Sequence, residues 1–229
     1  MAFLDRRDAG QKLAALLLHH RGPDTLVLGL PRGGVPVAYE VAVVLDAPLD
    51  VWVVRKLGVP YQPELGMGAI AEGEGLYLNA SVMEAVEVSP RDVDAVIARE
   101  RKELARRVQR FRGERSPPDV RGKTVLVVDD GIATGGTVRA ALAAIKERGP
   151  RHVVLATPVA PAETVAEFRG VVDEIVCVEV PYAMWSIGGF YEDFRQTTDD
   201  EVVELLERRR QMRHAGEPPS DTSESRPST

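Results

Sequence analysis

The segment at 125–137 constrains the fold of this chain more than any other part of it. It begins with four apolar residues, Val125 to Val128, and such an uninterrupted stretch is typical of a strand that is covered on both faces. Two acids and a loop of glycines and threonines follow, and from Val138 the apolar residues recur at helical spacing. A buried strand that leads directly into a helix predicts an α/β protein with a parallel sheet.

The loop between this strand and helix has the chemistry of a site for a phosphorylated sugar. At a helix N-terminus the backbone N–H groups lack partners and the helix dipole is positive, so a phosphate binds there without a basic side chain. Thr134 and Thr137 add hydroxyl donors, while Asp129 and Asp130 can accept hydrogen bonds from a sugar diol or hold a hydrated Mg²⁺. The segment is neither a Walker loop nor a dinucleotide fingerprint, because it lacks the lysine of the first and its acids precede the glycines.

The whole segment resembles the signature of the type I phosphoribosyltransferases, in which hydrophobic residues and two acids precede Thr-Gly-x-Thr. An ordinary Asp-Gly turn would account for only one or two of these residues. The resemblance implies Mg²⁺-dependent transfer of the 5-phosphoribosyl group from phosphoribosyl pyrophosphate (PRPP) to a nitrogenous base, with release of pyrophosphate. It also implies a cytoplasmic pentosyltransferase (a glycosyltransferase) of nucleotide salvage that forms a homodimer. It gives Asp129 and Asp130 a catalytic role on the ribose and on the metal, mainly through water, and gives substrate binding to Gly131, Ile132, Ala133, Thr134, Gly135, Gly136 and Thr137.

A second turn of the same kind, Pro31-Arg32-Gly33-Gly34, lies between a predicted strand and a predicted helix. The carboxyl ends of parallel strands share one edge of a sheet, so both turns can face a single crevice. By itself the motif indicates only a flexible turn. The resemblance assigns Arg32, Gly33 and Gly34 to a pyrophosphate loop, in which members of the family often have a non-proline cis peptide bond.

Two adjacent cations, Arg55 and Lys56, end the predicted strand at 49–55. The resemblance gives both a catalytic role beside the pyrophosphate, whereas the simpler interpretation is a solvated end of a strand. The loop that follows, from Leu57 to about Gly75, is rich in glycine and proline. We expect it to close over the substrate and exclude water from the reacting anomeric carbon.

The acceptor base is predicted less directly. Ala133 precedes the signature threonine, where family members that act on 6-oxopurines commonly have an aspartate, so the resemblance favours a purine-like acceptor of the adenine type. In adenine-type members an acid of the flexible loop lies near the base, and three residues remain open for that part, Glu64, Glu72 and Glu74. Tyr182 and Trp185 are candidates for a hood that stacks on the base, or for a small core between hood and sheet.

Strands and helices alternate along the chain, which predicts a doubly wound, mainly parallel sheet with helices on both faces. We expect one phosphoribosyltransferase-like domain over 1–213, in which a core at about 25–180 carries a helical insertion at about 80–112. The N-terminal helix and 181–213 would form the hood, and 214–229 a disordered tail. The expected strands are 25–30, 49–55, short pieces near 69–78, one from about 123 to 128, 152–157 and 174–180; the expected helices are 5–21, 34–46, 80–87, 90–112, 136–148, 161–169 and 199–213.

Composition excludes several other classes of protein. No apolar stretch is long enough for a membrane span and no signal peptide is evident, so we expect a cytosolic protein. Cys177 is the only cysteine, which rules out a disulfide framework within one chain. The four histidines, His19, His20, His152 and His214, show no metal-ligand spacing along the sequence.

The helix expected at 90–112 suggests an alternative function. Between Arg99 and Arg112 it has seven basic and two acidic residues. A basic face can bind nucleic acid, and some proteins of this fold are regulators, so the alternative is a PRPP-sensing regulatory protein that binds RNA or DNA. The net charge of −6 argues against broad affinity for phosphate backbones, so nucleic acid is not an expected partner. The simpler explanation is a solvated helix that packs on the domain or on a second subunit.

Overall fold

The computed structural model describes residues 3–216 and contains a five-stranded sheet with the order β2-β1-β6-β7-β8. All four strand pairings in it are parallel, which confirms the predicted doubly wound architecture. Its strands are β1 (Thr25–Gly29), β2 (Leu49–Val51), β6 (Thr124–Val128), β7 (His152–Val159) and β8 (Glu174–Glu179). The helices beside it are α1 (Arg6–Leu16), α2 (Gly34–Leu45), α5 (Gly136–Lys146), α6 (Ala162–Phe168) and α7 (Asp199–Gly216).

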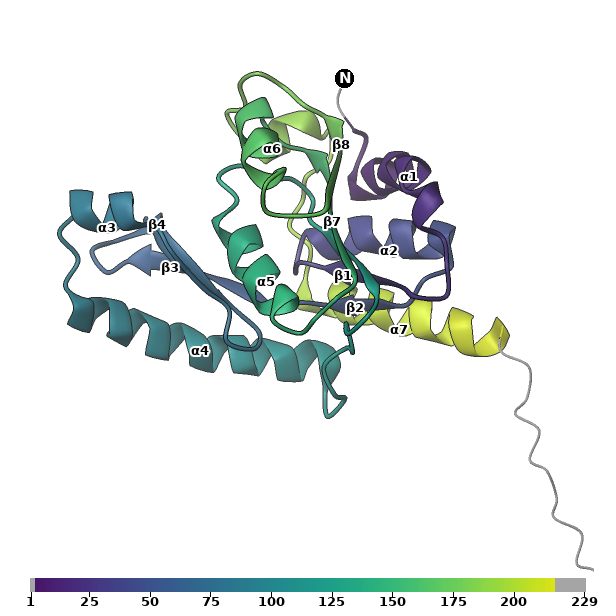
Figure 1. Cartoon of the computed structure of the whole chain (residues 1–229), viewed down its shortest axis with the longest axis horizontal. Coiled ribbons are helices and arrows are strands. Elements are labelled where there is room, and N and C mark those ends of the chain that lie inside the picture. The colour runs from purple at the N-terminus through teal and green to yellow at the C-terminus, as the bar shows by residue number, and fades with distance from the viewer. Residues whose placement is uncertain (1–2, 217–229) are drawn as a thin grey trace, which may run out of the picture.

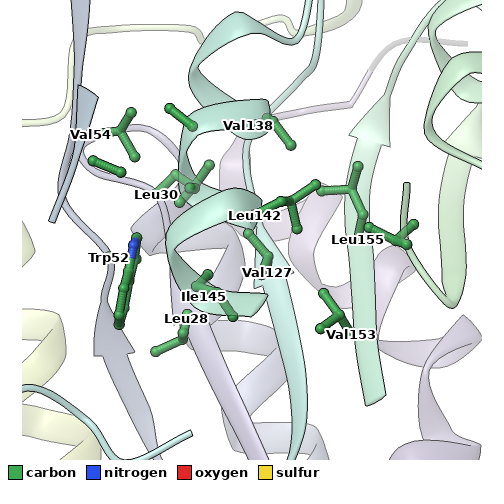
Figure 2. Packing of buried hydrophobic residues seen from close by; sticks show 14 of the residues in the cluster. Leu28, Leu30, Trp52, Val54, Val127, Val138, Leu142, Ile145, Val153 and Leu155 are labelled. Carbon is green, nitrogen blue, oxygen red and sulfur yellow. The ribbon is translucent and has the colours of Figure 1, made fainter. Parts of the chain in front are cut away.

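The central strand β6 is buried on both faces, as its apolar sequence predicts. Val125 and Val127 belong to a core cluster that includes α5 and Trp52, while Leu126 and Val128 pack in a second cluster formed with α1, α2 and α7. Figure 2 shows the first cluster, with Trp52 and the side chains of α5 around Val127. Successive side chains of a strand point to opposite faces, so one apolar stretch contributes to both layers.

A second, three-stranded antiparallel sheet extends from one side of the molecule (Figure 1). It consists of β3 (Val54–Val59), β4 (Gln62–Ala71) and β5 (Leu76–Leu78), and α3 (Ala80–Ala85) and the long α4 (Pro90–Arg112) follow it. We call residues 54–112 the arm. Its own core joins Leu57 and Met67 of the hairpin to Val93 and Val96 of α4. The helices predicted at 80–87 and 90–112 are therefore confirmed.

Two predictions in this region are wrong. The strand expected at 49–55 is divided, because β2 ends at Val51 and the chain then passes into β3 of the other sheet. The loop expected from Leu57 to about Gly75 is largely the β3–β4 hairpin. Its glycines suggested mobility, but the apolar residues between them are buried against α4 and hold the segment as a sheet.

The N-terminal residues pack against the segment that precedes α7. Phe3 pairs with Tyr191 in an isolated bridge, and the Phe3 N–H donates to the carbonyl of Phe190 at 2.6 Å. The helix expected at 5–21 ends at Leu16 and is followed by a short 3-10 helix, Leu18–His20. A second 3-10 helix, Ile187–Phe190, lies after β8.

The end of the described chain differs slightly from expectation. Residues 214–216 were expected to begin a disordered tail, but they continue α7, whereas 217–229 lie outside the described residues. Among the helices of residues 3–216, none combines the length and the apolar character that crossing a bilayer requires.

Candidate functional site

A cavity of about 320 Å³ lies beyond the carboxyl end of β6, between the sheet and the arm. Every residue of the predicted sugar-phosphate segment from Asp129 to Thr137 lines it. The arm contributes Lys56, Tyr77 and Asn79, and Ile187 closes the side next to the hood segment. The fold therefore brings the loop predicted from the sequence to a concave surface large enough for a small ligand.

The start of α5 is shaped to receive an anion. The N-cap residue Gly135 is in the left-handed region with a φ of 69°, and no described side chain caps the helix. The N–H groups of the first turn are thus left for a ligand, at the positive end of the helix dipole. A Cβ at position 135 would lie 2.5 Å from the Phe168 ring, so the close packing as well as the φ value requires glycine.

The two acids lie beside each other at the entrance to this loop, Asp130 buried and Asp129 partly buried. Burial raises the pKa of Asp129 well above its ordinary value, and the neighbouring charge of Asp130 raises it further. Burial also raises the pKa of Asp130, against the opposing effect of Arg6. One Asp129 oxygen accepts the N–H of Asp130 at 2.9 Å. Two adjacent carboxylates with raised pKa values fit a divalent cation, which would neutralise their charge. They also fit a sugar diol, whose hydroxyl groups would donate hydrogen bonds to them.

Two residues hold Asp130 in place, a role that the sequence analysis assigned to neither of them. Arg6 of α1 donates to its carboxylate at 2.7 Å, and the Tyr191 hydroxyl donates to its backbone carbonyl at 2.6 Å. Both partners lie far from the signature in the sequence, and neither belongs to a recognisable motif. Only the packing of the N-terminal residues on the segment around Tyr191 brings them together.

The second predicted turn meets the first directly. The peptide bond between Pro31 and Arg32 is cis, which agrees with the expectation from the family resemblance. A Cβ at Gly33 would lie 1.9 Å from an Asp130 carboxylate oxygen, so glycine is required for the two turns to touch. The Arg32 side chain, however, faces α7, with its Nη1 3.6 Å from Asp199 Oδ1, and it does not line the cavity.

The structure separates the two cations that the sequence placed together. Lys56 lines the cavity, and its ammonium group donates to the carbonyl of Glu64. Arg55 faces the other side of β3, where its Nη2 lies 2.6 Å from Glu100 of α4. Neighbouring residues of a strand point to opposite faces, so a predicted strand end with two cations supplies only one of them to the cavity.

The three candidate acids for base recognition do not line the cavity in the described chain. Glu72 is buried and accepts hydrogen bonds from Arg112 of α4, one of them 3.1 Å long. The exposed Glu74 lies 3.5 Å from Arg101. Glu64 is exposed on β4. Glu72 is therefore bound within the arm and faces Arg112 instead of the cavity.

The two hood candidates are also outside the cavity. Tyr182 and Trp185 are fully exposed, at 99% and 101%, and neither packs in a core. Tyr77 is the aromatic residue that lines the cavity, and the sequence analysis missed it. One feature of the sequence could have pointed to Tyr77. It lies in the apolar segment 76–78, which pairs with β4 next to the glycines that line the cavity.

The basic residues of α4 are largely neutralised within the chain. Arg106 and Arg107 both pair with Glu103, and hydrogen bonding to Arg106 is the main cause that lowers the pKa of this carboxyl to about 2. The remaining arginines of the helix that pair with acids are Arg99 with Glu100, Arg101 with Glu74, Arg110 with Asp200 and Arg112 with Glu72 and Asp50.

Comparisons with known proteins bear on the family to which this chain belongs. The crystal structure of TT1426 from Thermus thermophilus superposes with a TM-score of 0.75 at 41% identity, covering 90% of this chain and 98% of that one. A Mycobacterium tuberculosis protein named "Putative phosphoribosyl transferase" is 49% identical over 206 residues, which are 90% of this chain and 46% of the relative. This chain thus spans about half the length of that relative. A "Bifunctional protein PyrR" of Chloroflexus aurantiacus is 36% identical over 104 residues, covering 45% of this chain and 51% of the relative.

A family profile described as "Phosphoribosyl transferase domain" matches residues 4–195. The matched range includes both turns, the arm and the residues that hold Asp130. Since the sheet, the cavity and the signature loop all lie within that range, the chain belongs to the phosphoribosyl transferase domain family.

Proposed function

We propose that the cavity binds PRPP with Mg²⁺ and that the protein transfers the phosphoribosyl group to a nitrogenous base, releasing pyrophosphate. The observation that carries this proposal is the meeting of an uncapped helix N-terminus and an adjacent pair of acids in one cavity of about 320 Å³. The first suits a phosphate and the second suits a ribose diol and a hydrated cation.

Each part of the cavity has a defined task in this proposal. The backbone of the 131–137 loop holds the 5-phosphate, and Asp129 and Asp130 accept hydrogen bonds from the ribose hydroxyls. The base nitrogen attacks the anomeric carbon while the bond to pyrophosphate breaks on the opposite face, so the configuration inverts. Lys56 is the cavity cation that stabilises the charge growing on the leaving group. When bound beside the acids, Mg²⁺ would supply further neutralisation of that charge.

The acceptor in this proposal is a purine-like base of the adenine type, as Ala133 favours. Tyr77 and Asn79 lie on the arm side of the cavity, where an aromatic ring and an amide can stack on a base and hydrogen-bond to its edge. We therefore assign base recognition to these two residues in place of the loop acids. A cytoplasmic location and a homodimeric assembly remain part of the proposal.

A PRPP sensor that binds RNA or DNA is the alternative, and the similarity to proteins named PyrR keeps it in view. The paired arginines of α4 weigh against it, because a side chain already bound to an acid gains less from a phosphate. Lys56 in the cavity favours catalysis over sensing, because the departing pyrophosphate needs a positive charge to stabilise it.

The decisive experiment measures pyrophosphate release from PRPP and Mg²⁺ with adenine, hypoxanthine, guanine, xanthine, uracil, orotate and nicotinate, beside calorimetric PRPP binding. We expect adenine to react and Lys56→Ala to lower kcat more than it weakens PRPP binding. Lys102→Ala, a lysine of α4 outside the cavity, is the matched control. Binding without turnover for every base would replace catalysis by sensing, and absence of PRPP binding would overturn the site itself.

A further inference from the structure

Three of the four histidines gather at the edge of the sheet opposite the cavity. His19 and His20 form the end of the first 3-10 helix, while His152 begins β7 and Glu174 begins β8. Glu174 is their common partner. Its Oε1 lies 3.1 Å from His19 Nε2, and its Oε2 lies 3.0 Å from His20 Nε2 and 3.9 Å from His152 Nε2.

The main chain fixes this arrangement. β7 and β8 are adjacent parallel strands, so their first residues lie at the same edge of the sheet. The carbonyl of His20 accepts the Thr25 hydroxyl at 2.5 Å, which ties the 3-10 helix to the start of β1. The His20 side chain is only 10% exposed. Three separate segments thus converge, which explains why the histidines show no ligand spacing along the sequence.

Three histidine rings share the single Glu174 carboxylate, which cannot form a separate ion pair with each of them. The His19 and His20 rings are 4.1 Å apart and the His20 and His152 rings 6.0 Å apart, so protonation of all three would place like charges close together.

The distances suit a four-coordinate metal. Zinc–nitrogen bonds of about 2.0–2.1 Å in a tetrahedral site place neighbouring ligand atoms about 3.3 Å apart. The ligand atoms of His19, His20 and Glu174 all lie within 4.8 Å of one another, and their two nitrogen–oxygen distances of 3.0 and 3.1 Å are close to that value; His152 lies outside this group.

We propose that His19, His20 and Glu174 form a binding site for a transition metal ion of the zinc class, with water completing the coordination, separate from the PRPP cavity. Imidazole nitrogens with one carboxylate suit Zn²⁺ and its neighbours better than Mg²⁺, which prefers oxygen ligands. The ion would join the end of the N-terminal helical segment to the first residue of β8. It would therefore act on the stability of the fold, far from the reacting atoms.

The test titrates the full chain, freed of metal with a chelator, with Co²⁺ followed by visible absorption, and then displaces Co²⁺ with Zn²⁺. We expect one equivalent of a tetrahedral Co²⁺ spectrum, full displacement by Zn²⁺ and a higher melting temperature with Zn²⁺. His19→Ala and Glu174→Gln should each weaken binding by more than the roughly 10- to 100-fold that is typical of losing an outer-shell partner.

His214→Ala is the matched control, because it removes a histidine from α7 and should leave both affinity and spectrum unchanged. Circular dichroism of each variant without metal separates loss of ligand from loss of fold, and Glu174→Gln preserves the shape of the side chain. An octahedral spectrum, or equal affinity in wild type and in both ligand variants, would overturn the proposal.

Discussion

Arg6 Nε lies 2.7 Å from Asp130 Oδ2, so the first helix of the chain supplies the counter-charge for an acid of the signature loop. The same guanidinium group donates to the carbonyl of Arg195 at 2.7 Å and lies 4.0 Å from the centre of the Phe194 ring. Arg6 therefore joins the N-terminal helix, the segment before α7 and the cavity in one contact network. It acts on the site by positioning Asp130.

Arg6→Ala should lower the free energy of unfolding by about 3 kcal/mol, because it leaves the buried Asp130 carboxylate without its partner. Chemical denaturation measures this change, and a double-mutant cycle with Asp130→Asn should show that the two effects are not additive. Arg7→Ala is the control, since Arg7 is 75% exposed and lies 3.4 Å from Glu40. Equal losses for Arg6→Ala and Arg7→Ala would contradict the assignment.

The raised pKa of Asp129 predicts a distinct dependence of stability on pH. Its ordinary value is 3.8, and burial together with the charge of Asp130 raises it in the native state. Between these two values the native state keeps a proton that the unfolded state has lost. This carboxyl therefore makes stability fall as pH rises through that window, by up to about 1.4 kcal/mol per pH unit.

Denaturation of the wild type and of Asp129→Asn over a pH series from about 3 upward isolates this contribution. The stability of the wild type relative to the variant should decline with rising pH above about 4 and then level off once the native carboxyl is ionised. Other acids, such as Glu103, have lowered pKa values and act in the opposite direction, but they are common to both proteins. Parallel curves would show that Asp129 is not protonated in the native state.

Glu72→Gln should destabilise the arm without changing the choice of base. Arg112 is 1% exposed at its side chain and depends on Glu72 and Asp50 for charge compensation, so removal of one carboxylate should cost about 3 kcal/mol. Thermal denaturation measures the loss, and Glu74→Gln is the control because Glu74 is 83% exposed at its side chain. A variant of normal stability with an altered acceptor would restore Glu72 as a base-recognition residue.

Asp199→Asn should strengthen PRPP binding if Arg32 leaves α7 to contact the pyrophosphate. The pair is partly exposed and 3.6 Å apart, and such ion pairs are worth less than about 1 kcal/mol, so a gain in affinity of about two- to fivefold is expected. Calorimetry against PRPP and Mg²⁺ gives the affinity, with Asp200→Asn on the same helix as control. Unchanged affinity would indicate that Arg32 stays at α7.

The central fold and the loop after β6 could be predicted because their signals are local. Val125 to Val128 are apolar without interruption, and the acids, glycines and helix follow within a few residues, so the strand, the turn and the uncapped helix start are encoded in one segment. The pairing of the two turns also follows from sheet geometry. Parallel strands place their carboxyl ends together whatever the intervening sequence.

The contacts that the sequence did not reveal are tertiary. Arg55 and Lys56 look equivalent in sequence, but the register of β3 sends one to α4 and the other to the cavity. The sequence made Glu72 a plausible loop acid, but in the structure it accepts a hydrogen bond from Arg112 of α4. In each case the partner is at least 40 residues away, so the deciding interaction has no local pattern.

The contact between Gly33 and Asp130 limits how the protein can evolve or be redesigned. Since no side chain fits between the two turns, neither loop can change its backbone path unless the other changes with it. Under the proposed function, a change of acceptor would therefore begin on the arm side of the cavity, where Tyr77 and Asn79 belong to segments outside both turns. The proposed ribose side of the cavity then changes only as a unit, and the proposed base side is the part open to selection.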